Sequence, residues 1–260
     1  MLLSKHRPKI HVTATTQHFP ALLAGIIDGD GHINKIPQLC IAFHEKDVSV
    51  AYDLKSRIGF GTVSPVKNKR AYTLVVSHKR GLEVVATWVR HKLHLESKRT
   101  QYNTRLHKLP NFQATTLPCS ELFDSAWFCG FFYCDGSFQI KLVNWATKPL
   151  PEVRLVIQID QKDVRILESI KNTFGGYIGY RKNLATQDTW YWSSVSFKCA
   201  QRVCNYFDRY PLMGTKQVEY ILWRRVLVKI QEGLHLRAEN IAWFEKQKQK
   251  ISFVKNQLVA

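Results

Sequence analysis

Two aspartate–glycine pairs in this 260-residue chain occur in closely similar surroundings. The segment LLAGIIDGDG (residues 22–31) places Asp30 before a glycine, and WFCGFFYCDG (residues 127–136) does the same with Asp135. A single Asp-Gly pair is more often a tight turn than a metal site. Two copies, each ending an expected helix and opening an alternating strand, favour a shared chemical role. Because carboxylates are ligands that Mg²⁺ prefers, these two aspartates are the first candidate metal ligands.

Small residues recur at every fourth position through both segments. They are Ala21, Gly25 and Gly29 in the first segment and Ala126, Gly130 and Cys134 in the second. Residues four apart lie on one helix face, so each helix presents a flat stripe that another backbone can approach closely. We expect the two helices to pack along a pseudo-twofold axis, which brings Asp30 and Asp135 to one edge of the contact.

Two carboxylates that close together repel unless cations lie between them. A pair of Mg²⁺ ions roughly 4 Å apart, with Mn²⁺ able to substitute, relieves the repulsion and stabilises both the attacking and the leaving oxygen of phosphodiester hydrolysis. We expect the backbone carbonyls of Gly29 and Cys134 to help bind these ions. The six cysteines form no CxxC pair and no zinc-binding spacing, which favours a hard cation held by oxygen and a reducing compartment.

The similarity extends beyond the two motifs, because further segments recur in the same order. They are LCIAFHEKDV (39–48) with LVIQIDQKDV (155–164), and SKRTQY (97–102) with TKQVEY (215–220). Asp47 and Gly59 are 12 residues apart, and so are Asp163 and Gly175. Landmarks that recur in order at near-equal spacing indicate an internal duplication.

The duplication predicts how the chain is organised. We divide it into an N-terminal repeat (1–104), a linker (105–122) and a C-terminal repeat (123–260). Each repeat is expected to contain a helix, two strands, a helix, two strands and a helix, with helices over 48–58 and 164–174. The predicted fold class is therefore α/β of the α+β type: two αββαββα repeats, each with a curved antiparallel sheet.

At these residues the chain resembles the LAGLIDADG homing endonuclease family, in its single-chain form with two repeats. LAGIIDGDG (23–31) is close to the family name itself, and the family's metal-binding acid falls on Asp30 and, in the second copy, on Asp135. The second copy departs from the pattern at Tyr133, which matches Asp28 of the first copy. In the family that first acid belongs to the helix end and is not usually a metal ligand, so the departure weakens the motif match more than the metal site.

The resemblance also implies supporting residues outside the two motifs. The polar groups that organise active-site water in the family correspond to Glu45 and Gln161, with Lys46 and Lys162 next to them. The family's active-site lysines, which offset phosphate charge in the transition state, correspond to Lys98 and Lys216. The two polar residues also suit a helix cap or a strand end, and the two lysines also suit ordinary phosphate contacts or solvated positions.

Polar side chains alternate with apolar ones along the expected strands, and more of them occupy the adjoining hairpins. A ribbon of sheet fits the major groove of DNA, where Arg and Gln read base edges and Lys contacts phosphates. The residues expected to bind DNA are Asn34, Gln38, Lys67, Lys69, Arg70, Gln139, Lys141, Arg154, Gln158, Arg181 and Lys182.

The charge of the chain supports a polyanionic partner. Lys and Arg number 38 against 20 Asp and Glu, which gives a net charge of +18. Basic side chains that neutralise phosphates release condensed counterions, so double-stranded DNA is the expected partner. The apolar runs are too short to span a bilayer, which argues against a membrane protein.

Three functions fit these features. The preferred one is a site-specific DNA endonuclease that makes a double-strand break in a long, asymmetric target and so promotes intron homing. The alternatives are an intron maturase that binds host intron RNA on the same fold, and a catalytically inactive DNA-binding protein. We expect a monomer, because each repeat supplies the other's partner. The resemblance also implies an intron-encoded protein of a mitochondrion or chloroplast.

Overall fold

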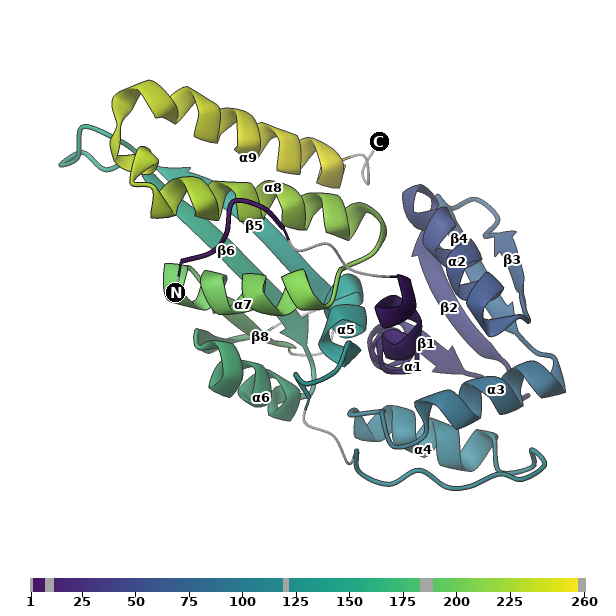
Figure 1. The fold of residues 1–260 in the computed structure, drawn as a ribbon. Coiled ribbons are helices and arrows are strands. Elements are labelled where there is room, and N and C mark those ends of the chain that lie inside the picture. Colours follow the sequence, from purple (N-terminus) through teal and green to yellow (C-terminus); the bar gives the residue numbers. More distant parts are fainter. Residues whose placement is uncertain (1, 8–11, 119–121, 183–188, 257–260) are drawn as a thin grey trace. The chain divides into compact units, whose positions relative to one another are not determined.

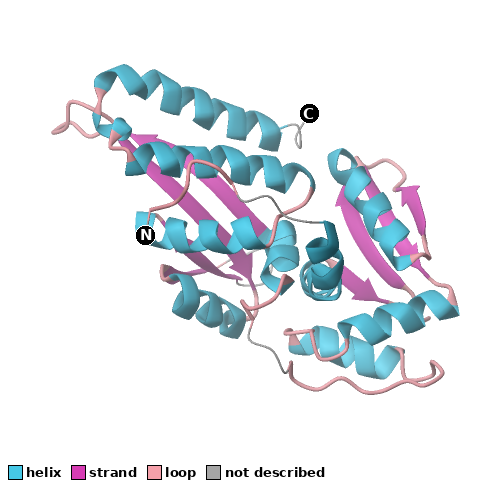
Figure 2. Cartoon of the chain, in the orientation of Figure 1, coloured by secondary structure: helices cyan, strands magenta, loops and turns pink. Residues whose placement is uncertain are grey.

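The computed structural model describes residues 2–7, 12–118, 122–182 and 189–256. The chain forms two compact units, which we call the N-terminal unit (residues 11–134) and the C-terminal unit (residues 1–10 with 135–260). Each unit contains one four-stranded antiparallel sheet with helices packed against it (Figures 1 and 2). No helix in the described part of the chain is both long and apolar enough to cross a membrane.

The N-terminal unit is built around the first motif. Its helices are α1 (Val12–Gly29), α2 (Val48–Ile58), α3 (Lys79–Val89), α4 (Glu96–Arg105) and α5 (Trp127–Asp135), of which α5 ends at the first residue of the other unit. Its strands are β1 (Gly31–Ile33), β2 (Leu39–His44), β3 (Thr62–Pro65) and β4 (Ala71–Val76), in the spatial order β1-β2-β4-β3. A single 3-10 turn at Glu45–Asp47 joins β2 to α2.

One face of this sheet is buried under helices, and the other is open. Ile41 is paired with Leu74, so both side chains point to the same face, where both are buried. His32 is paired with Cys40 on the opposite face, and His32 is exposed. Alternation along antiparallel strands therefore separates an apolar face, which packs against α2, from an open face of small and polar side chains.

The C-terminal unit repeats this order of strands and helices and adds a last helix, and three of its four strands are longer. Its helices are α6 (Val164–Phe174), α7 (Phe197–Arg209), α8 (Gly214–Gln231) and α9 (Ile241–Asn256). Its strands are β5 (Gly136–Val143), β6 (Glu152–Gln161), β7 (Tyr177–Arg181) and β8 (Thr189–Ser194), in the order β5-β6-β8-β7. The edge strand β5 contacts both α8 and α9, which run beside each other (Figure 1).

An aromatic cluster fills the core of the C-terminal unit. The Phe138 ring, on β5, lies 5.1 Å from the Trp223 ring, 5.8 Å from the Tyr220 ring and 5.9 Å from the Phe207 ring, measured between centroids. All four side chains are buried. Burying a side chain of this size contributes about 1.5–3 kcal/mol, so this cluster fixes α7 and α8 on the sheet.

The ends of the two middle helices agree closely with the sequence. Helices were expected over 48–58 and 164–174, and α2 and α6 have these limits. Gly59 ends α2 with a φ of 77°, a left-handed conformation that glycine adopts without strain. Asp163 caps α6 by accepting from the Arg165 N–H (3.1 Å), whereas the Asp47 side chain makes no capping hydrogen bond to α2.

The end of each repeat differs from the expectation of a single last helix, because α3 and α4 occur there in the first repeat and α7, α8 and α9 in the second. Between α3 and α4 the chain turns at His91, whose φ is 58°. Between α7 and α8 it passes through Pro211 and reaches Gly214 with a φ of 53°. Proline and left-handed residues interrupt helices, so each break has a local cause.

Candidate functional site

Helices α1 and α5 approach each other backbone to backbone at two glycines. A Cβ atom on Gly25 would lie 2.0 Å from the Trp127 carbonyl oxygen and 2.8 Å from the Phe131 nitrogen. A Cβ atom on Gly130 would lie 2.1 Å from the Leu22 carbonyl oxygen. A side chain would overlap backbone atoms at both positions, so the contact requires glycine. The close packing expected from the small residues is confirmed.

Asp30 directly follows α1, and its backbone N–H continues the helix by donating to the Ile26 carbonyl (2.9 Å). Its side chain is open to solvent, yet enough protein surrounds the carboxylate to raise its pKa above the ordinary value. A hydrogen bond with Cys134 and the charge of Lys98 act in the opposite direction. A further cation at this accessible carboxylate would offset its desolvation, as expected of a metal ligand.

Lys98 is held beside the first motif by a backbone contact. It lies one turn into α4, and its Nζ donates to the Gly31 carbonyl at 2.5 Å. The side chain is partly buried, so its charge is screened less by water than that of a surface lysine. The ammonium group therefore stands at the start of β1, one residue beyond Asp30.

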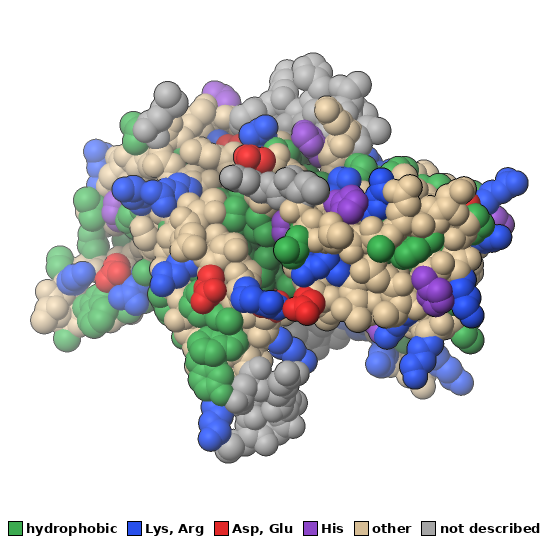
Figure 3. Space-filling model, turned by 90° about the horizontal axis from the view of Figure 1, so that it is seen from below, with side chains coloured by type: hydrophobic (Ala, Val, Ile, Leu, Met, Phe, Trp, Pro, Cys, Tyr) green, Lys and Arg blue, Asp and Glu red, His purple; other side chains and the backbone are tan. Residues whose placement is uncertain are grey.

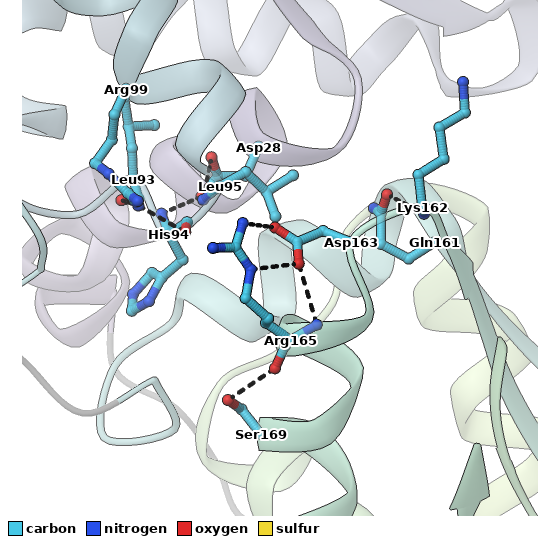
Figure 4. Close-up of polar contacts among 10 residues, drawn as sticks. All are labelled: Asp28, Leu93, His94, Leu95, Arg99, Gln161, Lys162, Asp163, Arg165 and Ser169. Atoms are coloured by element: carbon cyan, nitrogen blue, oxygen red, sulfur yellow. Dashed lines mark hydrogen bonds and ion pairs between the residues drawn. The ribbon is translucent and has the colours of Figure 1, made fainter. Parts of the chain in front are cut away.

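Asp28 is a buried structural acid that organises the start of α4. Its carboxylate accepts the backbone N–H groups of His94 (2.7 Å) and Leu95 (3.3 Å) and the indole N–H of Trp127 (2.7 Å). Burial raises its pKa to about 7, although these three hydrogen bonds lower it. Figure 4 shows the carboxylate against the 93–95 segment, which leads into the helix that carries Lys98.

Arg99 secures the same segment from the other side. Its Nη1 donates to the carbonyls of Leu93 (3.0 Å) and His94 (2.7 Å), as Figure 4 shows. The backbone N–H groups of the segment are thus bound by Asp28 and its carbonyls by Arg99. This arrangement fits the expectation that the first acid of the motif belongs to the helix end.

Tyr133 occupies the corresponding position of the second motif and makes different contacts. Its ring packs against Phe43 of β2, with 6.5 Å between ring centroids. Burial raises the pKa of its hydroxyl, and the charge of Asp47 adds to this effect. The departure from the family pattern is therefore an aromatic side chain that packs on the sheet of the N-terminal unit.

The C-terminal unit places three predicted residues together at the start of β5. The Gln161 side-chain amide donates to Asp135 Oδ2 at 3.2 Å, and its carbonyl oxygen accepts the Lys162 N–H at 2.7 Å. The Lys216 Nζ donates to the Gly136 carbonyl at 2.7 Å, as Lys98 does to Gly31. An acid, an amide and an ammonium group therefore converge within this unit.

Glu45, which corresponds to Gln161, has a different principal partner. Its carboxylate pairs with Arg70, at the base of the β3–β4 hairpin. Lys46 follows it, and the Lys46 N–H donates to His44 Nδ1 at 3.3 Å. The equivalent position therefore has different partners in the two units. Gln161 binds the motif acid Asp135, whereas Glu45 forms an ion pair with Arg70 of the β3–β4 hairpin.

Most residues expected to bind DNA from the C-terminal unit share the open face of its sheet. The pairing of Lys141 with Arg154 and of Ser137 with Gln158 places these side chains on the face opposite the buried Phe138. Gln139 and Arg181 share this face by the same register, and Lys182 follows β7. Three of these side chains already have an acidic partner in the sheet. Arg154 binds Glu152, and both Gln158 and Arg181 bind Asp160.

The N-terminal unit presents its predicted DNA-binding residues at the ends of its strands. Asn34 and Gln38 lie in the β1–β2 turn, where the Asn34 N–H donates to the Gln38 carbonyl at 2.9 Å. Lys67, Lys69 and Arg70 are exposed in the β3–β4 hairpin. On the face of the molecule drawn in Figure 3, Lys and Arg side chains are spread widely and Asp and Glu side chains are fewer.

The oxygen donors near each motif suit a hard cation. In the described part of the chain no three His, Cys, Asp or Glu side chains gather in the manner of a metal cluster. Each unit instead offers one motif carboxylate, with the carbonyl of Gly29 or Cys134 preceding it in the chain. Carboxylate and carbonyl oxygens with room for water match the preferences of Mg²⁺, which usually keeps several waters.

Two basic residues near the motif strands were not singled out from the sequence. Arg105, assigned to the start of the linker, binds the Ile33 carbonyl, and its Nη1 lies 3.3 Å from His32 Nε2. Lys255 of α9 donates to Ser137 Oγ at 2.9 Å. Arg105 could have been found because it is seven residues, or two helical turns, after Lys98. Lys255 has no counterpart in the first repeat, so the duplication gave no signal.

The described part of the chain is thus a mixed α/β fold with two four-stranded antiparallel sheets, each with an aspartate and a lysine where its first strand begins. The sequence profile of the family described as LAGLIDADG endonuclease matches residues 128–227. An uncharacterized cox1 intron-2 protein of Schizosaccharomyces pombe is 39% identical over 94% of this chain and 76% of its own length. The chain belongs to the LAGLIDADG endonuclease family.

Two further relatives span the functions found in such proteins. A probable intron-encoded endonuclease 4 of Neurospora crassa is 24% identical over 88% of this chain and 43% of its own length. The intron-encoded RNA maturase bI4 of Saccharomyces cerevisiae is 27% identical over 63% of this chain and 25% of its own length. This chain therefore spans less than half of either relative.

The fold is also that of solved meganuclease structures. The crystal structure of the LAGLIDADG meganuclease I-AabMI bound to uncleaved DNA superposes with a TM-score of 0.71 at 18% identity. The match covers 88% of this chain and 98% of that one. The predicted fold class is confirmed.

Proposed function

We propose that this chain is a site-specific DNA endonuclease that makes a double-strand break in a long, asymmetric target and promotes intron homing. The observation that carries the proposal is the repeated pairing of a motif aspartate with a lysine bound to the next carbonyl. Asp30 has Lys98 at Gly31, and Asp135 has Lys216 at Gly136. A chain that only bound DNA would have no need to retain this arrangement twice.

In the proposed reaction each unit acts on one strand. A water oxygen bonds to phosphorus, one P–O ester bond breaks, and the proton of the water ends on the leaving oxygen. Bound divalent ions, Mg²⁺ or Mn²⁺, would supply charge compensation for the phosphate and activate the water. Asp30 and Asp135 would hold these ions, with the carbonyls of Gly29 and Cys134 in support.

The remaining polar residues act around the reacting phosphate. Lys98 and Lys216 are fixed by backbone carbonyls, so their charges are already oriented toward negative charge that develops in the transition state. Gln161, bound to Asp135, orients water in the C-terminal unit. Glu45 has the corresponding role in the N-terminal unit, with Arg70 as its partner.

The sheets recognise the target in this proposal. The open face of the C-terminal unit presents Gln139, Lys141, Arg154 and Gln158 side by side, which suits base edges and phosphates in a major groove. The DNA-bound state of the similar meganuclease supports the same assignment. The intron-derived names of the relatives support an intron-encoded origin, and we propose a location in a mitochondrion or chloroplast.

Selection from a randomised DNA library tests the proposal. Purified full-length chain with Mg²⁺ should cleave a defined subset of duplexes, and a plasmid carrying the selected site should be linearised. An intronless cox1 segment serves as a second substrate, because one relative is encoded in a cox1 intron. Binding without cleavage of any duplex would contradict the proposal and favour a catalytically inactive DNA-binding protein.

An intron maturase is the second candidate function, and the similarity to the RNA maturase bI4 is the observation that favours it. A splicing assay with the host intron RNA separates the two activities. Faster splicing with the chain present would establish maturase activity, and cleavage of the intronless DNA would establish the nuclease.

A further inference from the structure

The N-terminal unit holds a second cation beside its motif, in addition to Lys98. Arg105 lies two turns after Lys98 on the same face of α4. Its guanidinium binds the Ile33 carbonyl, and its Nη1 lies 3.3 Å from His32 Nε2. His32 is the second residue of β1 and follows the motif's last glycine. Arg105 therefore contacts a residue that is two positions after Asp30 in the chain.

The C-terminal unit has no arginine at the matching position, because Trp223 occupies it on α8. The duplication matches Lys98 with Lys216, and the seventh residue after Lys216 is Trp223. Trp223 is fully buried against Phe138, as part of the core. A cation at this position of the helix is therefore absent.

Lys255 of the C-terminal helix supplies a cation at the corresponding place. Its Nζ donates to Ser137 Oγ at 2.9 Å. Ser137 is the second residue of β5 and matches His32 of β1. Helix α9 runs beside α8 and along the edge strand β5, which brings its last turn to the start of that strand (Figure 1).

A buried acid helps to hold Lys255 in place. Glu219 is 2% exposed, and its Oε2 lies 3.6 Å from Lys216 Nζ and 3.9 Å from Lys255 Nζ. This oxygen has no hydrogen-bond partner within the described part of the chain, so its interaction with the two ammonium groups is electrostatic. Two cations near one another repel, and a shared carboxylate offsets that repulsion.

The equivalent residue of the first repeat is neutral. Gln101 matches Glu219, and its side-chain oxygen accepts the Ile33 N–H at 3.1 Å. Arg105 needs no acid there because it is anchored by the Ile33 carbonyl and is carried by the same helix as Lys98. The acid therefore occurs only in the unit where the second cation comes from a separate helix.

Each cation contacts a side chain that lies on the open side of its sheet. Arg105 approaches His32, which is paired with Cys40 on the face opposite the buried Ile33. Lys255 contacts Ser137, which is paired with Gln158 on the face that presents the residues expected to bind DNA. We therefore expect a phosphate bound at either motif aspartate from this side to lie near the second cation.

We propose that Arg105 and Lys255 are equivalent phosphate-contacting residues, each serving the DNA strand that is cut beside its own aspartate. Helix α9 thereby completes the site of the C-terminal unit. This inference rests on the proposed nuclease function. A second fixed cation strengthens charge compensation on a phosphate whose negative charge grows in the transition state.

The test is strand-resolved cleavage of the selected duplex, labelled on each strand. Lys255→Gln should slow cutting of one strand about tenfold or more, leave the other unchanged and let nicked product accumulate. Arg105→Gln should show the opposite strand preference. Lys250→Gln is the matched control, because Lys250 is exposed on the same helix and its loss removes the same charge. Lys255→Arg should restore most of the lost rate.

Binding without cleavage provides a second readout that does not depend on turnover. With Ca²⁺ in place of Mg²⁺, Lys255→Gln should lower the slope of log affinity against log salt by about 1, as expected when one phosphate contact is lost. Its melting temperature should stay close to that of the Lys250→Gln control.

The outcomes separate this inference from the proposed function. Wild-type chain that cuts neither strand contradicts the nuclease itself. Wild-type chain that cuts normally, together with a Lys255→Gln variant that slows both strands equally or neither strand, overturns the inference and leaves the nuclease in place.

Discussion

Asp30 and Asp135, the last acids of the two motifs, are more exposed to solvent than the nearby Asp28. Asp30 remains accessible although the surrounding protein raises its pKa, and Asp135 is partly exposed with one amide on Oδ2. Asp28, two residues before Asp30, is buried and accepts three hydrogen bonds. Accessibility therefore separates the acids that can bind an ion from the one that holds the fold together.

Replacing either motif aspartate tests the chemistry directly. Asp30→Asn and Asp135→Asn each remove a metal-binding charge and preserve shape, so DNA binding should persist while cleavage falls by orders of magnitude. A metal contributes several kcal/mol to the transition state, and each 1.36 kcal/mol corresponds to about tenfold in rate. Gel shift and cleavage on the same duplex measure both effects. An Asp30→Asn protein that cuts both strands at the wild-type rate removes the proposed mechanism.

Asp28 should make the stability of the chain depend on pH. Its pKa rises from 3.8 to about 7 on folding, so the folded state holds the proton more tightly and stability falls as pH increases from about 4 to about 7. His94, whose pKa burial lowers to about 4, acts in the opposite sense over the same range. The comparison is therefore wild type against Asp28→Asn. The free energy of unfolding in urea, measured at several pH values, should lack this Asp28-dependent fall with rising pH in the variant. Identical pH profiles for the two proteins would contradict the prediction.

The two motif helices pack as one element because glycine leaves no side chain at the two points where their backbones approach most closely. Each glycine faces the backbone of the partner helix at a distance where even a methyl group would overlap carbonyl oxygen. Along the chain, α1 leads directly to Asp30 and α5 ends at Asp135.

Larger residues at these glycines should damage folding before they damage chemistry. Gly25→Leu and Gly130→Leu force the helices apart, and overpacking of this kind costs typically about 1–3 kcal/mol, with more expected against rigid backbone. Melting temperature and urea unfolding measure the loss. Gly233→Asn is the matched control, because Gly233 has open space around it and a left-handed φ of 72° that asparagine tolerates. A Gly25→Leu variant with wild-type melting temperature would show that the close contact is wrong.

The sequence predicted elements whose signals are local and repeated, and it missed those set by distant contacts. The limits of α2 and α6 result from apolar periodicity ended by glycine. The small residues Gly25 and Gly130 indicated where the two motif helices pack against each other. Arg105 was placed in the linker because proline and loss of periodicity come after it, although α4 continues to this residue. Lys255 lies on α9 and is 118 residues away from Ser137 in sequence, so only the fold brings them together.

At the scale of the whole molecule, one chain already supplies both units, so we predict a monomer without DNA. Each unit buries its own apolar sheet face under its own helices, and the motif helices are paired within the chain. Sedimentation equilibrium should give the mass of one 30.2 kDa chain. A stable dimer in the absence of DNA would contradict the proposal that the second unit replaces a second subunit.

The net charge of +18 should make DNA binding depend steeply on salt. Lysines in the β3–β4 hairpin and on β5 are exposed, whereas Arg154 and Arg181 are paired with acids in the same sheet. These two arginines must leave their acidic partners before they can bind phosphates. The exposed lysines should therefore account for most of the counterions released on DNA binding.

A protein with 6–10 phosphate contacts loses roughly 10³–10⁵ in affinity between 50 and 200 mM salt. Fluorescence anisotropy with Ca²⁺ across this range should show a loss of this size for the selected duplex. Lys67→Gln with Lys69→Gln should lower the slope by about 2, since two phosphate contacts are removed. A nearly flat dependence would show that the basic side chains of the hairpin and the open sheet face do not contact the DNA backbone.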